Sequence, residues 1–406
     1  MLTGTISLLR NRNFRLFCLA NLFGDIPLIM QGFVLIWLIS ELSPSIIIVS
    51  ITSFCFGIPF LFFGFFSGYI AEKFNRPLIL VLVHFIKILT AISIAIFLFT
   101  DSFQITHGFI AAVILGTVNS FAFTSRRSLA LHLIDKNKAS ASTATDYIGM
   151  GICAVIGPSL SGFVIKEIGS GYTQIIISVF SFAALLTLLQ IIHTDKKETP
   201  SSIKKNDKSI KKNPSVIQFI INKPILLVIF GLAILTNLFT MNYHFLVIII
   251  SKTILLRDVQ STGILLTAGA LGFFVIVIFL SSLSEIKSKL LIIIPSFFGA
   301  VISIILFALS TNYLLSYLIL ALVGISNGIF ITMQIGILGK YASKELLPRL
   351  LGINTTIVGI GPFGALILGK FADIYSAQIS LIICGTACII IATLIIIPLS
   401  KIKNNQ

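Results

Sequence analysis

Charged residues are scarce in this chain. They make up 11% of its 406 residues, whereas about a quarter of the residues of an ordinary soluble domain are charged. Hydrophobic residues make up 56%, and the mean hydropathy is +1.06. A water-soluble domain cannot bury so much apolar surface, so we expect the chain to lie in a lipid bilayer.

Patterns of catalysis and metal binding are also missing. The sequence has no nucleotide-binding loop, no metal-ligand cluster and no nucleophile arrangement. The five cysteines fall in apolar stretches, and Cys384 and Cys388, which share a predicted helix face, have no histidine or carboxylate beside them. We therefore expect no enzymatic chemistry, no metal, no cofactor and no transport driven by ATP.

Twelve apolar stretches are long enough to span a bilayer, because a hydrocarbon core about 30 Å thick needs about 20 helical residues. We predict an all-α membrane protein with spans at 13–39, 45–71, 77–100, 105–131, 139–166, 172–193, 223–250, 259–282, 289–310, 312–339, 348–373 and 377–400. The ninth and tenth spans divide near Ser310 to Asn312.

The basic residues are concentrated on one side of these spans. With both termini in the cytoplasm, only Lys166, Lys252, Arg257 and Lys370 of the 29 lysines and arginines fall on the opposite side, and Lys87 falls within a span. This asymmetry follows the positive-inside rule and predicts cytoplasmic termini. The formal charge of +15 then belongs to loops beside the membrane and does not indicate a nucleic-acid partner.

The expected location is the bacterial inner membrane, where the chain crosses many times and contacts lipids. No cleavable signal peptide is expected, since residues 1–12 are polar and the first apolar run is too long. We expect a monomer.

An internal repeat divides the chain in two. The runs from Leu115 to Ser120 and from Val323 to Gly328 echo each other, and the offset that relates Asn119 to Asn327 also relates Arg126 to Gln334. The only long hydrophilic stretch lies between the halves. We predict two pseudo-symmetric six-helix bundles, 1–193 and 223–406, joined by a cytoplasmic linker at 194–222.

Predicted helices one, four, seven and ten each carry a polar stripe, because their polar residues recur at helical spacing. A polar stripe in a membrane must face the bundle interior or a water-filled space. The candidates for binding protons or substrate on these helices are Asn21, Asp25 and Gln31, then Asn119 and Arg126, then Asn237 and His244, and finally Asn327 and Gln334.

Local motifs give the chain a resemblance to the major facilitator superfamily along its whole length. The run from Gly68 to Arg76 (GYIAEKFNR) is similar to that family's Gly-x-x-x-Asp-(Arg/Lys)-x-Gly-Arg loop, and Gly24-Asp25 is similar to a pair common in its drug and siderophore exporters. Gly157-Pro158-x-x-x-Gly162 resembles its antiporter motif, with a partial copy at Gly361-Pro362-x-Gly364. Within the family the chain resembles macrolide efflux proteins and enterobactin exporters.

The resemblance implies a latch between the two halves on the cytoplasmic side. Glu72, Lys73 and Arg76 would form it, with the acid facing the N-terminus of helix eleven, where the helix dipole favours a negative charge by about 0.3–1 kcal/mol when exposed. The chain departs from the pattern, since Glu72 replaces aspartate and Asn75 replaces glycine. The alternative is a charged turn that only sets topology.

Asp25 is the foremost candidate for a protonatable site. It lies near the middle of helix one, where insertion scales place the cost of an acid at about 2.5–3.5 kcal/mol. Asp146 lies about two turns into helix five, and it could pair with Arg126 near the cytoplasmic end of helix four. The alternatives are a structural hydrogen bond for Asp25 and, for Arg126, a side chain that reaches the lipid headgroups.

Other residues have both a functional and a structural interpretation. Lys87, with His84 one turn earlier, could form a buried pair with Asp25, but a structural role on a peripheral third helix is favoured. His244 could relay protons or simply be a satisfied polar residue. The glycine-proline runs would let helices five and eleven pack tightly against helices of the opposite half.

Together these features predict a secondary active transporter that works by alternating access. The favoured hypothesis is proton-coupled export of an amphipathic small molecule, such as a drug, a macrolide-like compound or a siderophore. The alternatives are a lysophospholipid or metabolite carrier without proton antiport, and a degenerate transporter that acts as a sensor or assembly partner.

Overall fold

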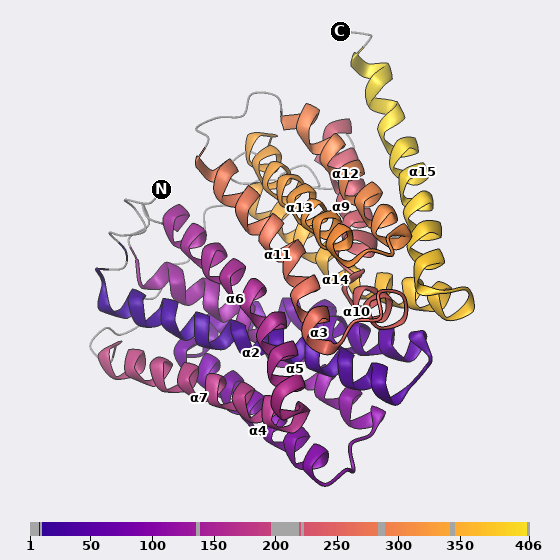
Figure 1. Cartoon of the computed structure of the whole chain (residues 1–406). Coiled ribbons are helices and arrows are strands. Elements are labelled where there is room, and N and C mark those ends of the chain that lie inside the picture. The colour runs from indigo at the N-terminus through magenta and orange to yellow at the C-terminus, as the bar shows by residue number, and fades with distance from the viewer. Residues whose placement is uncertain are drawn as a thin grey trace.

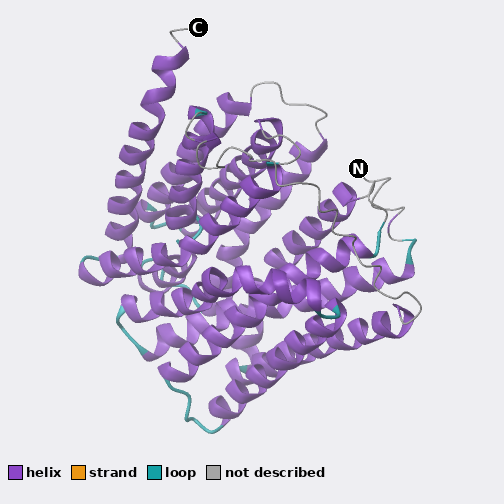
Figure 2. Cartoon of the chain, turned by 180° about the vertical axis from the view of Figure 1, so that it is seen from behind, coloured by secondary structure: helices purple, strands orange, loops and turns teal. Residues whose placement is uncertain are grey.

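The computed structural model describes residues 8, 10–134, 139–195, 219–220, 223–282, 289–341 and 346–403. Every regular element in these ranges is a helix (Figure 2). Twelve spans in this part are long and apolar enough to cross a membrane. The predicted all-α membrane fold is confirmed.

The first half of the chain forms six long helices. They are α2 (Arg12–Leu42), α3 (Ile46–Lys73), α4 (Arg76–Phe99), α5 (Ile105–His132), α6 (Ala139–Ile168) and α7 (Ser170–Asp195). Local sequence sets several of their ends. The Asn11 side chain caps α2, and Pro77 occupies the first turn of α4, where no backbone donor is lost. Gly169 separates α6 from α7 with a φ of 94°, a conformation that favours glycine.

The second half repeats this arrangement. It contains α9 (Pro224–Leu235), the π-helical turn η2 (Thr236–Thr240), α10 (His244–Thr253), α11 (Val259–Ser282), α12 (Lys289–Leu309), α13 (Tyr313–Tyr341), α14 (Leu347–Ile374) and α15 (Ala377–Lys403). The predicted spans agree with these bounds to within a few residues. The predicted division between the ninth and tenth spans is confirmed between Leu309 and Tyr313.

The helices gather into two bundles, one from each half (Figure 1). The closest contacts between the bundles join α6 to α11 and α3 to α14. The predicted two-bundle fold is therefore confirmed. The linker predicted at 194–222 lies largely outside the described residues, so its boundaries stay predictions.

Figure 1 shows that the bundles diverge toward the side on which both chain termini lie. We call this the terminal side, and the opposite side, where α2 ends and α3 begins, the distal side. The helices that join the bundles meet on the distal side and near the middle of the spans.

The seventh span is broken, so the prediction of one continuous helix at 223–250 was wrong in this respect. Its π-helical turn is followed by a turn at Met241 to Tyr243 before α10 begins. Side chains satisfy carbonyls near the break, since Asn242 Nδ2 donates to Asn237 O and to Gly361 O at 2.8 Å. Asn237 and His244 therefore do not share the single regular helix face that their spacing predicted.

Only part of the glycine-proline prediction is confirmed. A Cβ atom at Gly162 would meet the Val259 and Gln260 backbone of α11, and Pro362 packs on Gly57 of α3, so these residues do contact the opposite half. Pro158 of α6 likewise presents its carbonyl to Gly263 of α11.

The other three glycines pack within their own half, which corrects the prediction for them. Gly157 lies against Ile29 of α2, and Gly361 and Gly364 lie against Asn237 and Leu238 of the broken span. The physical reason is helix rotation: residues three or four apart face one neighbour, and the remaining residue of each run, Gly157 or Pro362, faces another.

Candidate functional site: a shared arginine and a small cavity

An arginine on α5 bridges two carboxylates from neighbouring helices. Arg126 Nη1 lies 2.6 Å from Asp25 Oδ1 on α2, and Arg126 Nη2 lies 2.6 Å from Asp146 Oδ1 on α6. Arg126 Nε also donates to Asp146 Oδ1 at 2.9 Å, and Asn21 Nδ2 donates to the same oxygen at 3.2 Å. The pairing predicted for Arg126 and Asp146 is confirmed. We call these four residues the charge cluster.

The charge cluster is largely removed from solvent. The exposed fractions of the Asp25, Arg126 and Asp146 side chains are 11%, 14% and 22%. Two carboxylates and one guanidinium carry a net charge of −1, and the buried Lys87 on α4 lies near enough to Asp25 to offset it. Low-dielectric surroundings make every change in this balance costly, so uptake of one proton at a carboxylate would change the contacts among these groups.

Asp25 is the less strongly held of the two carboxylates. Its Oδ1 accepts one hydrogen bond, from Arg126 Nη1, whereas Asp146 Oδ1 accepts three. Neutralising Asp25 would break one charge-assisted bond, and neutralising Asp146 would weaken three. The geometry thus makes Asp146 the anchor of Arg126 and Asp25 the more exchangeable partner.

His84 and Lys87 of α4 lie beside the charge cluster. The sequence had favoured a structural role for them. The Lys87 side chain is buried and near enough to interact electrostatically with Asp25, although no ion pair joins them among the described residues. His84 packs on Gly24, where a Cβ atom would lie 2.6 Å from His84 Cε1. The Gly24-Asp25 pair thus brings α4 against the acid, a contact signalled in the sequence only by the His84-x-x-Lys87 spacing.

The second half carries an uncharged copy of this pairing. Gln334 Nε2 donates to Asn354 Oδ1 at 2.7 Å, and the repeat offset relates these residues to Arg126 and Asp146. The hydrogen bond thus identifies Asn354 as the counterpart of Asp146 in the second half. Among the described residues, charge in this layer is thus confined to the first half.

The remaining stripe residues have separate surroundings. Asn327 accepts a hydrogen bond from Thr240 Oγ1 at 3.0 Å, and Asn237 donates to Ala233 O of its own helix. Asn119 Nδ2 and both amide atoms of Gln31 are buried and lack partners among the described residues.

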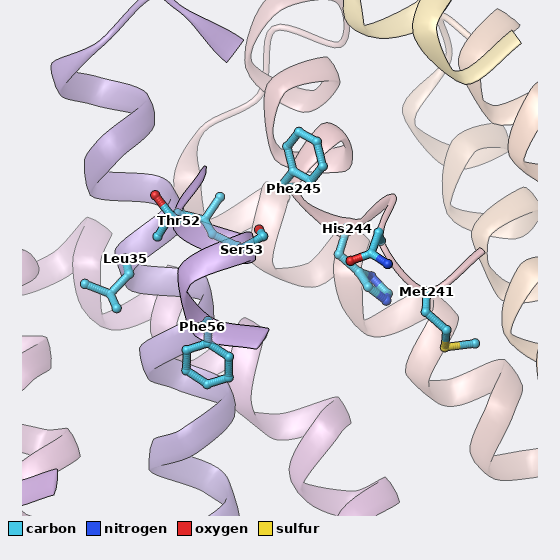
Figure 3. Close-up of a pocket in the computed structure, with 10 residues that line it drawn as sticks. Leu35, Thr52, Ser53, Phe56, Met241, His244 and Phe245 are labelled. Atoms are coloured by element: carbon cyan, nitrogen blue, oxygen red, sulfur yellow. The ribbon is translucent and has the colours of Figure 1, made fainter. Parts of the chain in front are cut away.

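A small cavity lies between the two halves near the break in the seventh span. Its volume is about 160 Å³. In Figure 3, Thr52, Ser53 and Phe56 of α3 lie on one side and Met241 and His244 on the other. Gly32, Leu35 and Ile36 of α2, together with Asn242 and Phe245, complete the lining. Of the predicted site residues, His244 alone lines this cavity.

The predicted latch cannot be placed in full. Gly68 lies near the end of α3, on the terminal side, and Arg76 is the first residue of α4. Lys73 is exposed, and its Nζ lies 5.8 Å from the centre of the Tyr69 ring. The side chains of Glu72 and of the first residues of α14 lie outside the described residues. The latch therefore stays a prediction.

Polar contacts join the two halves on the distal side. Asp373 at the end of α14 accepts hydrogen bonds from Ser45 Oγ and Ile46 N, both at 2.8 Å, and from Ile47 N at 3.3 Å. It thereby caps the N-terminus of α3 from the opposite half, where the helix dipole favours an acid. Lys252 Nζ donates to Ser40 O at 3.3 Å.

A further distal contact is the ion pair between Lys166 Nζ and Asp258 Oδ2, 2.8 Å apart. The hydrogen bond from Lys166, helped by Ser261, lowers the pKa of the Asp258 carboxyl to about 2. Because this pKa lies below its usual value near 3.9, the pair is fully formed above about pH 4 and is lost only as the pH falls through about 2.

Replacing Asp373 by alanine is expected to loosen the distal side. Loss of a helix cap costs about 0.5–2 kcal/mol. A loss of about 1 kcal/mol would raise the equilibrium constant for opening of the distal side roughly fivefold. The readout is labelling of Ser53→Cys, inside the cavity, by an impermeant thiol reagent added from the distal side. Asp101→Ala, in the loop before α5, is the control. Equal labelling rates in the Asp373 variant and the control would refute the capping role.

The arrangement defines a class: the described residues form twelve membrane spans in two pseudo-symmetric bundles, and each bundle contains buried polar side chains. The family model of the Major Facilitator Superfamily matches residues 17–365 and 231–405. The chain therefore belongs to the Major Facilitator Superfamily, and it is a membrane transporter rather than an enzyme.

Solved transporter structures share this fold. A POT family transporter in complex with 5-aminolevulinic acid superposes with a TM-score of 0.73 at 11% identity, covering 95% of this chain and 96% of that one. The nucleoside transporter NupG gives 0.72 at 15% identity, covering 95% and 98%. A bacterial homologue of the human lysosomal transporter Spinster, inward-facing and unoccupied, gives 0.69 at 12%, covering 95% and 96%.

No curated protein matches the chain. Structural similarity at such low identity shows the fold alone. The superfamily resemblance is confirmed, while the narrower resemblance to drug and siderophore exporters, the substrate and the direction of transport are not decided by these relatives.

Proposed function

We propose that this transporter is a proton-coupled exporter of an amphipathic small molecule, located in a bacterial inner membrane as a monomer with both termini in the cytoplasm. The observation that carries the proposal is the guanidinium of Arg126 shared between Asp25 and Asp146, each 2.6 Å away. Superfamily membership supports transport itself.

The charge cluster offers a way to couple protons to a conformational change. Protonation of Asp25 removes its attraction for Arg126 and leaves the guanidinium to Asp146. Because these side chains come from α2, α5 and α6, the exchange alters contacts among three helices of one half. A buried ionisable cluster of this kind is costly in a membrane and marks ion pathways.

Alternating access follows from the two-bundle fold. In this structure the contacts of Asp373, Lys166 and Lys252 hold the distal side together, and the bundles diverge on the terminal side (Figure 1). With cytoplasmic termini, the side on which the bundles diverge faces the cytoplasm. Rocking of one bundle against the other would then exchange distal contacts for contacts on the terminal side, where Glu72 is placed by the sequence.

The amphipathic class of substrate is supported by the surfaces between the halves. The cavity is lined by apolar residues such as Leu35 and Phe56 together with hydroxyl and amide groups. A molecule that passes such a surface needs both apolar bulk and a few polar atoms.

Reconstitution into proteoliposomes with an imposed pH gradient tests the proposal. The panel contains macrolides, siderophores and lysophospholipids, and a trapped pH-sensitive dye reports proton movement. Proton movement that depends on one of these substrates supports the proposal. Substrate movement without proton movement would favour an uncoupled lipid or metabolite carrier, and absence of any flux would favour a sensor or assembly partner.

A further inference from the structure

The cavity beside the broken span has a size and lining that narrow the chemistry of its occupant. We propose that it is the subsite for a neutral, ring-sized group of the substrate that carries both hydrogen-bond donor and acceptor atoms. This inference rests on the proposed function, in which a small molecule binds between the two halves.

The available volume sets the size of the group. A cavity of roughly 150 Å³ holds a single benzene ring, and this one measures about 160 Å³. Gly32 on α2 helps to keep it open, since a Cβ atom built there meets nothing within 4 Å. Any larger side chain at this position would fill the space that the ring needs.

Unpartnered polar groups at the cavity set the hydrogen bonding. Thr52 lines it with a side chain that is only 2% exposed. Its Oγ1 is closed off from solvent, points away from Met241 and His244 in Figure 3, and has no hydrogen-bond partner among the described residues, so Thr52 shapes the wall and does not bind the occupant. Ser53 and His244 line the same space and form no hydrogen bond among the described residues.

Hydroxyl and amide groups can recognise both donors and acceptors. The Ser53 hydroxyl can donate or accept, and Asn242, whose Nδ2 is already used by Asn237 and Gly361, keeps its Oδ1 as an acceptor. The first turn of α10 adds His244 and Phe245 to the lining. An amide or lactam fits this set, because it presents a carbonyl oxygen and an N–H together.

The absence of charge in the lining argues for a neutral group. None of the ten lining residues is a carboxylate, lysine or arginine. Gly32 lies seven residues beyond Asp25 on α2, which places the charge cluster about 10 Å away along the helix axis. A bare carboxylate or ammonium would therefore lose its water without gaining a counter-ion.

The position of the cavity favours a transported group over a structural water cluster. Its walls come from α2 and α3 of the first half and from the broken span of the second, so relative movement of the halves opens it. Binding sites in secondary transporters lie near the middle of the membrane, at discontinuous helices. Leu35, Ile36 and Phe56 supply an apolar wall that suits the face of a ring.

Four fragments of similar shape and different polarity test the proposal on the purified full-length protein: benzamide, benzoate, benzylamine and toluene. Trp37, the only tryptophan, directly follows the lining residue Ile36 on α2, so its fluorescence reports binding. We expect benzamide to bind in the millimolar range appropriate to its size and at least tenfold more tightly than benzoate or benzylamine. Equal or tighter binding of the charged fragments or of toluene, or no binding of benzamide, would overturn the proposal.

Two variants locate the site. Gly32→Leu should abolish benzamide binding by filling the cavity, and Ser53→Ala should weaken it about fivefold, the effect of one neutral hydrogen bond. The matched controls are Gly64→Leu, where a Cβ atom also meets nothing, and Ser93→Ala, whose hydroxyl bonds its own helix. Benzamide binding that survives both cavity variants, or that falls equally in the controls, would contradict the assignment.

The proteoliposome assay tests the proposed function independently of fragment binding, so the two can fail separately. Flux without proton movement in proteoliposomes overturns the coupling while benzamide selectivity still supports the subsite. Coupled flux with no preference for the neutral fragment overturns the subsite alone.

Discussion

Replacing Arg126 by glutamine is expected to abolish transport and to lower the stability of the folded protein. The change leaves Asp25 and Asp146 without the guanidinium that lies 2.6 Å from each. Removing one partner of a buried ion pair costs about 3–5 kcal/mol. Substrate flux in proteoliposomes and the unfolding temperature in detergent measure the two effects.

The adjacent Arg127 provides a matched control. It is a surface residue whose guanidinium stacks on Phe123 at 4.4 Å, so Arg127→Gln should leave flux and stability near the wild-type values. A second control combines Arg126→Gln with Asp25→Asn and Asp146→Asn, which removes the unpaired charges and should recover stability without recovering coupled transport. If R126Q alone transports as well as the wild type, the cluster is not the coupling site.

Replacing Gly364 by leucine is expected to prevent correct packing of α14 against the broken seventh span. A Cβ atom at this position would overlap the carbonyl oxygen and the Cα atom of Leu238, and backbone atoms cannot turn aside as a flexible side chain can. Overpacking of this kind costs typically about 1–3 kcal/mol, and contact with backbone places it at the upper end. Yield of monodisperse protein and its unfolding temperature are the measurements.

Gly352 on the same helix provides the control. It shows whether α14 tolerates glycine replacement where no close packing opposes it. A Cβ atom there meets nothing within 4 Å, so Gly352→Ala should be tolerated. Gly364→Ala, the smaller change, should still lower the unfolding temperature. Equal stability of the two alanine variants would mean that α14 does not approach the span as closely as described.

Hydropathy predicted the twelve spans because the length of an apolar run follows directly from membrane thickness. It could not predict the break at Thr236 to Tyr243, since the polar residues of this short segment are averaged with the strongly apolar residues on both sides and Pro224–Thr253 still counts as one apolar span. The break depends on tertiary contacts, such as the hydrogen bond from Asn242 Nδ2 to Gly361 O. Only the close spacing of Asn237 and Asn242 hinted at it.

The charge cluster was partly foreseeable. Helical periodicity placed Asn21, Asp25 and Arg126 on inward faces, and the cost of buried charge favoured pairing with Asp146. Which partner Asp25 takes depends on helix rotation and separation, and these are set by packing, as at Gly24 against His84. For the same reason the sequence could not decide between Arg126 and Lys87.

The internal repeat was most informative where the residues at equivalent positions of the two halves differ. Gln334 and Asn354 reproduce the contact of Arg126 and Asp146 with neutral amides. In the part of the chain that the structure describes, the layer therefore has hydrogen bonds in both halves and charges only in the first. This asymmetry supports our proposal that proton coupling resides in the first half.

The most direct test of the coupling site compares exchange with accumulation in the Asp25→Asn variant. Both are measured in proteoliposomes with a substrate identified from the panel, the first without a gradient and the second with an imposed pH gradient. We predict that the variant exchanges substrate within about twofold of the wild-type rate but accumulates none, because asparagine cannot load and release a proton. Wild-type accumulation by the Asp25→Asn variant would contradict the proposed coupling site.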